Sequence, residues 1–178
     1  DLKPENVFLA VDEARGQPVV KLLDFGIAKI IEDWTGPAPR TRTGVVYGTP
    51  DYLSPEQATG EAPLDGRSDL FSVGVVLFEM LSGTRLFRAS SEVATAFRVV
   101  HMAVPTLSSA GCVVDPRLEA VVQHLLMKNP DERYACAADV VRDLVALSPD
   151  VPARTAVIAQ LIDAERLLAE AKRRAPRS

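Results

Sequence analysis

Two short stretches near the start of the chain carry side chains that could do chemistry together. The first, Asp1-Leu2-Lys3-Pro4-Glu5-Asn6, supplies a carboxylate, an ammonium and an amide oxygen, and the second, Asp24-Phe25-Gly26, adds another carboxylate. A carboxylate can accept the proton of a hydroxyl, an ammonium can meet phosphate oxygens, and Mg²⁺ favours oxygen ligands. Gly26 allows a sharp backbone turn, and Phe25 would pack inward to hold Asp24 in place. Together these groups suit the transfer of a phosphoryl group.

The elements around these stretches begin with two runs of strand-forming residues, 7–11 and 19–23. The turn residues between them (DEARGQP) predict that the two runs pair as a β hairpin. Residues 24–63 show no sustained periodicity, and such a long irregular segment inside a compact domain is usually functional.

From residue 64 onward the pattern predicts helices. Residues 66–82 carry apolar side chains on nearly every face, which indicates a core helix that Gly83 can end in a left-handed conformation. Three further helices are expected, from Ser90 or Ser91 to about His101, from the cap Asp115 to about Lys128, and over 136–147.

Composition favours one soluble globular domain. The 178 residues are 47% hydrophobic and 25% charged with a net charge of −4, so the charge balance does not suggest nucleic acid as the main partner. The longest apolar stretch, residues 70–81, is too short to span a bilayer, and no signal peptide pattern is present. Cys112 and Cys136 form no CxxC pair, which favours reduced thiols. These features predict a cytoplasmic location for this part of the chain.

Five motifs in a fixed order resemble one family. They are DLKPEN, DFG, GTPDYLSPEQ, RSDLFSVGVVLFEMLSG and NPDERY, and they lie within residues 1–147. Their order resembles the C-terminal lobe of a eukaryotic-type (Hanks-type) serine/threonine protein kinase, in the form found in bacteria. The resemblance implies a mainly α fold with a small β hairpin, the kinase C-terminal lobe without the N-terminal lobe. It also implies ATP and Mg²⁺ as cofactors, with Mn²⁺ as an alternative ion, and proteins with Ser or Thr as substrates.

The resemblance assigns the catalytic roles residue by residue. Asp1 becomes the catalytic base, Lys3 the lysine that contacts the phosphate of the nucleotide, and Asn6 and Asp24 the metal ligands. The lysine two positions after Asp1 is typical of the serine/threonine form of the motif. Phosphoryl transfer from ATP to Ser and Thr hydroxyls is therefore the expected activity.

The resemblance also assigns residues of the activation segment, 24–56, and of the helical part, 64–147. Thr49 would touch the catalytic loop and help to select a Ser or Thr substrate. Glu56 and Arg133 would form a buried ion pair that anchors the segment. Asp69 would bind backbone N–H groups of the catalytic loop.

Two threonines of the activation segment have two readings. Thr41 and Thr43 are either exposed loop residues or sites of phosphorylation, because their distance from Thr49 resembles that of the autophosphorylated threonines of bacterial kinases. Phosphorylation is the favoured reading, and Arg40 and Arg42 would locally neutralise the added charge.

The composition changes at residue 148. Residues 148–178 read as a linker followed by an amphipathic helix with a basic end. This helix either docks on the lobe, which is favoured, or belongs to a juxtamembrane or partner-binding element of a longer protein.

The first residue, Asp1, corresponds to the aspartate of the family's His-Arg-Asp motif. The glycine-rich loop, the ATP-contacting lysine and its glutamate partner would precede it, so the chain is expected to be a fragment that is inactive without its N-terminal lobe. An alternative is a non-catalytic, kinase-like scaffold that binds proteins. The presence of Asp1, Lys3, Asn6 and Asp24 favours a catalytic parent, because decayed kinases typically lose such residues.

Overall fold

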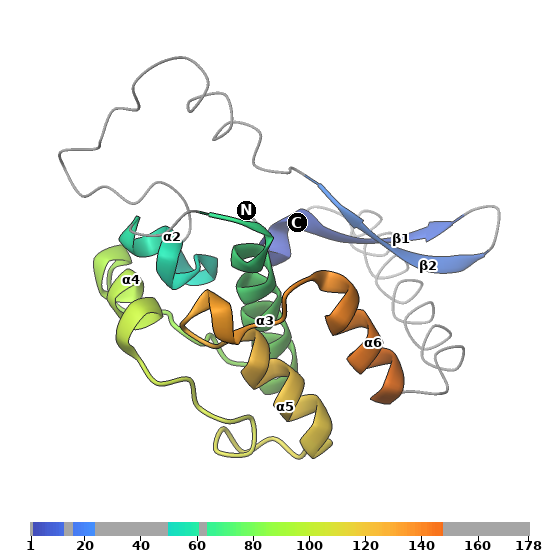
Figure 1. Cartoon of the computed structure of the whole chain (residues 1–178). Helices are drawn as coiled ribbons and strands as arrows, with labels where there is room; N and C mark the ends of the chain where they lie inside the picture. Colours follow the sequence, from blue (N-terminus) through green and yellow to red (C-terminus); the bar gives the residue numbers. More distant parts are fainter. Residues whose placement is uncertain (1, 13–15, 24–49, 61–63, 148–178) are drawn as a thin grey trace, which may run out of the picture. The chain divides into compact units, whose positions relative to one another are not determined.

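The computed structural model describes residues 2–12, 16–23, 50–60 and 64–147. The chain divides into two compact units, residues 1–4 with 24–147, and residues 5–23 with 148–178. The described part of the first unit is mainly helical, and the described part of the second holds a β hairpin (Figure 1). The described part of the chain is therefore mainly α with one two-stranded sheet, as predicted.

The hairpin pairs β1 (Val7–Asp12) with β2 (Gln17–Leu22) in antiparallel fashion. Val7 lies opposite Leu22, and Leu9 lies opposite Val20. Residues opposite each other share a face, so Val7, Leu9, Val11, Pro18, Val20 and Leu22 form one wholly apolar face. The predicted hairpin is confirmed, although β2 begins two residues earlier than expected.

Helix α3 (Gly66–Ser82) is the central element of the helical unit (Figure 1). The Asp65 side chain caps its first turn by accepting the Arg67 N–H, and Gly83 ends it with φ +68°, a conformation that favours glycine. These boundaries are those predicted from the sequence. The helix is not buried on every side, because Met80 is 74% exposed.

The remaining helical elements include the three further helices that were predicted, in the expected order. They are η2 (Pro50–Tyr52), α2 (Pro55–Thr59), α4 (Glu92–His101), α5 (Pro116–Leu125), η3 (Pro130–Glu132) and α6 (Ala137–Leu147), with η1 (Pro4–Asn6) before the hairpin. Ser91 and Asp115 cap α4 and α5, as expected. Helix α5 ends three residues before the predicted Lys128, and the short α2 was not predicted.

The core of the helical unit lies on two sides of α3. On one side Phe71 and Val75 pack with Phe87 and Val99, and on the other Leu70 packs with residues of α5 and α6. A Cβ at Gly74 would lie 2.8 Å from the Leu125 Cβ, so α3 and α5 approach closely at this point.

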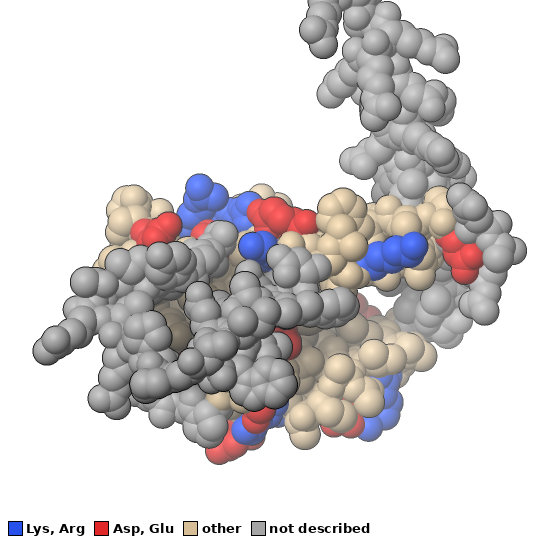
Figure 2. Space-filling model, turned by 90° about the horizontal axis from the view of Figure 1, so that it is seen from above, with Lys and Arg blue, Asp and Glu red and all other residues tan. Residues whose placement is uncertain are grey.

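The surface carries charges of both signs. On the face seen in Figure 2, basic and acidic side chains of the described residues lie beside one another, in keeping with the small net charge of −4. No helix in the described ranges combines the length and the hydropathy that crossing a membrane requires.

Candidate active site

The catalytic residues expected from the sequence are only partly described by the structure. Lys3 and Asn6 lie within the described residues. Outside them lie Asp1, Asp24, Phe25, Gly26, Thr41, Thr43 and Thr49. Asn6 is the last residue of η1, and its carbonyl accepts the backbone N–H of Leu23 at 2.8 Å. This bond joins the two ends of the hairpin, and Leu23 directly precedes Asp24 in the sequence.

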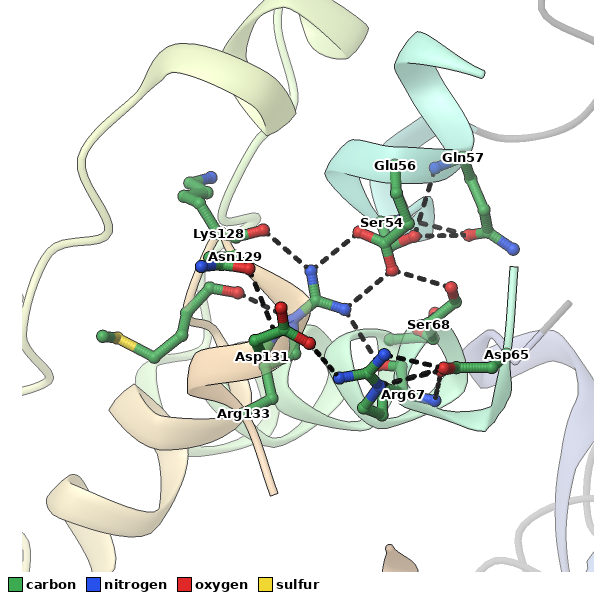
Figure 3. A network of polar contacts seen from close by, with 12 residues as sticks. Ser54, Glu56, Gln57, Asp65, Arg67, Ser68, Lys128, Asn129, Asp131 and Arg133 are labelled. Atoms are coloured by element: carbon green, nitrogen blue, oxygen red, sulfur yellow. Dashed lines mark hydrogen bonds and ion pairs between the residues drawn. The ribbon is translucent and has the colours of Figure 1, made fainter. Parts of the chain in front are cut away.

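Glu56 and Arg133 form a buried ion pair. The Arg133 Nη1 donates to Glu56 Oε1 at 2.7 Å, and Nη2 donates to Oε2 at 2.8 Å (Figure 3). Each of the two residues is only 5% exposed. Such bidentate pairs are strong because donor and acceptor are both charged and their geometry matches.

Arg133 also donates to three backbone carbonyls. Its Nε bonds Met127 O at 2.7 Å, Nη1 bonds Arg67 O at 2.9 Å and Nη2 bonds Lys128 O at 3.0 Å. With the two bonds to Glu56, these contacts use all five N–H groups of the guanidinium. Its Cζ lies 4.9 Å from the centroid of the Phe71 ring. The buried charge of Arg133 is therefore fully compensated.

Glu56 owes its position to the first turn of α2. Ser54 and Gln57 form a capping box around this turn, in which each side chain bonds the other residue's backbone N–H. Glu56 Oε1 accepts a further hydrogen bond from the Ser68 hydroxyl at 2.7 Å. Burial alone would raise the pKa of Glu56, but the hydrogen bonds from Arg133 and Ser68 outweigh it and lower the pKa to about 2.

A second arginine extends this network at the surface. Arg67 contacts Asp65 at 2.9 Å and Asp131 at 2.7 Å, so it links the start of α3 to η3 (Figure 3). The hydrogen bonds that Arg67 donates to Asp65 and Asp131 raise the pKa of Arg67. We call Glu56, Ser68, Arg67 and Arg133 with their partners the Arg133 network.

Asp69 lies beside this network in the first turn of α3. Its side chain is exposed and makes no hydrogen bond to the described residues. Its expected contact with the catalytic loop stays a prediction.

The structure also brings together residues that sequence reasoning missed. Ser72 Oγ donates to the Tyr52 carbonyl at 2.7 Å, and the Tyr52 hydroxyl donates to Glu79 Oε2 at 2.8 Å. Arg85 contacts Glu79 Oε2 at 3.1 Å and also donates to the Tyr52 hydroxyl. Tyr52 lies 27 residues from Glu79 and 33 from Arg85 in the sequence, so no local pattern could reveal the cluster.

Comparison with known proteins places these features in a family. A family model described as a protein kinase domain matches residues 1–144. The chain is 43% identical over 156 residues to the serine/threonine-protein kinase PknB of Mycolicibacterium smegmatis, which is 85% of this chain and 24% of that protein. It is 40% identical over 155 residues to the serine/threonine-protein kinase pkn3 of Myxococcus xanthus, which is 84% of this chain and 27% of that protein.

PknB of Mycobacterium tuberculosis is also similar. It is 40% identical over 168 residues, which is 93% of this chain and 25% of that protein. The chain thus spans about a quarter of the length of these relatives.

Proposed function

Because this chain belongs to the protein kinase family, we propose that it is the C-terminal lobe of an enzyme that transfers the γ-phosphoryl group of ATP to Ser and Thr hydroxyls of proteins. The relatives named above are serine/threonine-protein kinases, and the motif DLKPEN has the serine/threonine form. The chemistry rests on Asp1, Lys3, Asn6 and Asp24.

One observation carries the proposal. The hydrogen bond from Leu23 N–H to Asn6 C=O joins the two ends of the hairpin, and Asp24 is the next residue after Leu23. Asn6 and Asp24 thus flank the hairpin in the sequence, and we propose them as the two metal ligands. Their amide and carboxylate oxygens fit Mg²⁺, which prefers oxygen ligands. When bound, the ion would neutralise charge on the phosphate oxygens.

The residues then have separate roles in the transfer. The Asp1 carboxylate accepts the proton of the substrate hydroxyl, whose oxygen forms a bond to the γ-phosphorus while the bond to the bridging oxygen of ADP breaks. The Lys3 ammonium offsets the negative charge of the transferring group. Thr49 contacts the catalytic loop and helps to select the hydroxyl, and phosphorylated Thr41 and Thr43 regulate the segment.

The Arg133 network fastens the end of the activation segment. Glu56 lies seven residues after Thr49, and Arg133 fixes it to the N-terminus of α3 and to the backbone after α5. A segment held at this end loses little further entropy when a substrate binds to it.

An N-terminal lobe completes the proposed enzyme by covering the nucleotide. The apolar face of the hairpin supports further chain next to it, since Leu9 and Val20 are 53% and 59% exposed. We place the activity in the cytoplasm. The expected docking of residues 148–178 concerns residues outside those that the structure describes, and it stays a prediction.

The proposal is tested with residues 1–178 joined to the N-terminal lobe of a similar kinase. Incubation with radiolabelled MgATP and a basic carrier protein should label Ser and Thr and not Tyr. Labelling without a divalent ion, or no labelling at all, would reject the proposal.

A further inference from the structure

The turn η2 (Pro50–Tyr52) is fixed to α3 through both the backbone and the side chain of Tyr52. The Ser72 hydroxyl donates a hydrogen bond to the Tyr52 carbonyl, and the Tyr52 hydroxyl donates one to Glu79 Oε2 at 2.8 Å. Tyr52 is 2% exposed and belongs to the hydrophobic core. The position of this turn therefore depends on the contacts of Tyr52.

The turn contains an uncompensated polar group as well. Asp51 is 6% exposed, and its Oδ1 has no hydrogen-bond partner among the described residues. A buried oxygen without a partner destabilises the turn. The contacts of Tyr52 must therefore offset this destabilisation.

Arg85 completes those contacts from outside the core. The chain reverses at Gly83, so Arg85 returns to the last turns of α3, where Nη1 contacts Glu79 Oε2 at 3.1 Å and donates to the Tyr52 hydroxyl. Its Cζ lies 5.6 Å from the centroid of the Tyr52 ring, a cation–π distance. Next to it, the Leu86 N–H donates to Glu79 Oε1 at 3.1 Å.

We propose that Arg85 is a positioning residue for the protein substrate, acting through Tyr52 on the Pro50–Tyr52 turn. The inference rests on the proposed function, because Pro50 directly follows Thr49, the residue assigned to substrate selection. When Arg85 is removed, the turn loses a contact at the Tyr52 hydroxyl and one on the ring. The Pro50–Tyr52 turn then samples more conformations, and in fewer of them is the hydroxyl of the bound protein substrate placed correctly for the transfer.

The effect of Arg85 can be tested separately from that of the core residues that it contacts. Its side chain is 43% exposed, whereas that of Glu79 is 11% exposed and Tyr52 is buried. Exposed ion pairs contribute little to the free energy of folding. If the ion pair with Glu79 were the only role of Arg85, its removal would therefore change the activity little. Arg117 is a matched control, because it forms an exposed pair with Asp115 at 2.7 Å at the start of α5 and has no contact with Tyr52.

Hydrogen exchange on the 178-residue chain tests the contact itself. The N–H of Leu53 bonds Pro50 O at 3.3 Å and reports on the turn. Arg85→Ala should speed exchange of this amide by about tenfold, because local opening becomes easier, whereas Arg117→Ala should not. An unchanged Leu53 rate in Arg85→Ala would overturn the proposal.

Kinetics of the chain joined to an N-terminal lobe test the consequence for the substrate. Arg85→Ala should lower kcat/KM for a Ser-containing peptide by about tenfold. The rate at which water hydrolyses MgATP should change by no more than about twofold, because water does not depend on the Pro50–Tyr52 turn for its position. Arg85→Lys should recover part of the loss, since it keeps the charge but not the planar stacking.

Equal losses in peptide phosphorylation and in hydrolysis would show a general structural defect and overturn the positioning role. An unaltered peptide kcat/KM in Arg85→Ala would overturn it as well. If the unsubstituted chain joined to an N-terminal lobe phosphorylates no protein, the proposed function fails, and the substrate role of Arg85 fails with it. The exchange rate of Leu53 would still decide whether Arg85 holds the turn.

Discussion

Arg133 and Glu56 lie 77 residues apart in the sequence, and both terminal nitrogens of Arg133 donate to the two carboxylate oxygens of Glu56. The same guanidinium bonds the carbonyls of Arg67, Met127 and Lys128. One side chain therefore connects α2, the first turn of α3 and the loop after α5.

Removal of this side chain should destabilise the fold strongly. We expect Arg133→Ala to lower the free energy of unfolding by about 3–5 kcal/mol, because it leaves the buried Glu56 carboxylate without its cation. Urea denaturation followed by circular dichroism measures the change. Arg117→Ala removes an exposed pair and should leave the urea midpoint nearly unchanged. A loss below about 1 kcal/mol in Arg133→Ala would contradict the importance of the pair.

The low pKa of Glu56 predicts a pH dependence of stability. The pKa is about 2 in the folded state, against an ordinary value of 4.5. Between these values the unfolded chain binds more protons, so the contribution of Glu56 is complete above pH 4.5 and is lost as the pH falls toward 2. Denaturation at several pH values should show a shallower dependence for Glu56→Gln than for the unsubstituted chain. Identical slopes in this window would argue against the shifted pKa.

The two acidic residues of the proposed site should differ in their effects. In the chain joined to an N-terminal lobe, Asp1→Asn should lower kcat by about 10²–10⁴ and leave nucleotide affinity nearly intact, because a base acts mainly in the transition state. Asp24→Asn should also abolish Mg²⁺-dependent nucleotide binding, since it removes a metal ligand. Steady-state kinetics and calorimetry with MgATP separate the two. Equal losses of ATP affinity would contradict the assigned roles.

The close approach of α3 and α5 predicts a steric effect at Gly74. Gly74→Ala should lower the free energy of unfolding by about 1–3 kcal/mol, because the new methyl group would overlap side chains of Leu125 and Leu126. Gly66→Ala is the control, since nothing lies within 4 Å of a Cβ built there. Thermal denaturation of both variants checks this. A neutral Gly74→Ala would show that α5 can shift without cost.

The chain by itself should bind nucleotide weakly. In the proposed enzyme it supplies only one wall of the nucleotide site, so little apolar surface of ATP would leave water. We expect a Kd for MgATP of about 1 mM or weaker, equivalent to about 4 kcal/mol. Calorimetry on the 178-residue chain measures it. Micromolar binding, or phosphorylation of a carrier protein by this chain alone, would contradict the expectation.

Elements with local signals were predictable from the sequence. The strand residues on either side of a turn predicted the hairpin, and Gly83 marked the end of α3. The pattern Ser54-x-x-Gln57 is also a local signal, a capping box, and it would have predicted the start of α2.

Features that depend on tertiary contacts were not predictable in the same way. Helix α5 ends at Leu125 although apolar residues continue, and the carbonyls of Met127 and Lys128 just beyond it bond Arg133. The Tyr52 cluster likewise joins residues that only the fold brings together. The pair of Glu56 and Arg133 was expected from the family resemblance, and its three additional carbonyl contacts were not.

The separation of Glu56 and Arg133 has a consequence during protein synthesis. Chains are made from the N-terminus at about 5–20 residues per second, so Arg133 follows Glu56 from the ribosome after about 4–15 s. During that time the carboxylate that α2 is to bury has no guanidinium to neutralise it. The contact of residues 50–60 with α3 therefore lacks its buried ion pair until Arg133 has left the ribosome, although Ser68 of α3 can already donate to Glu56.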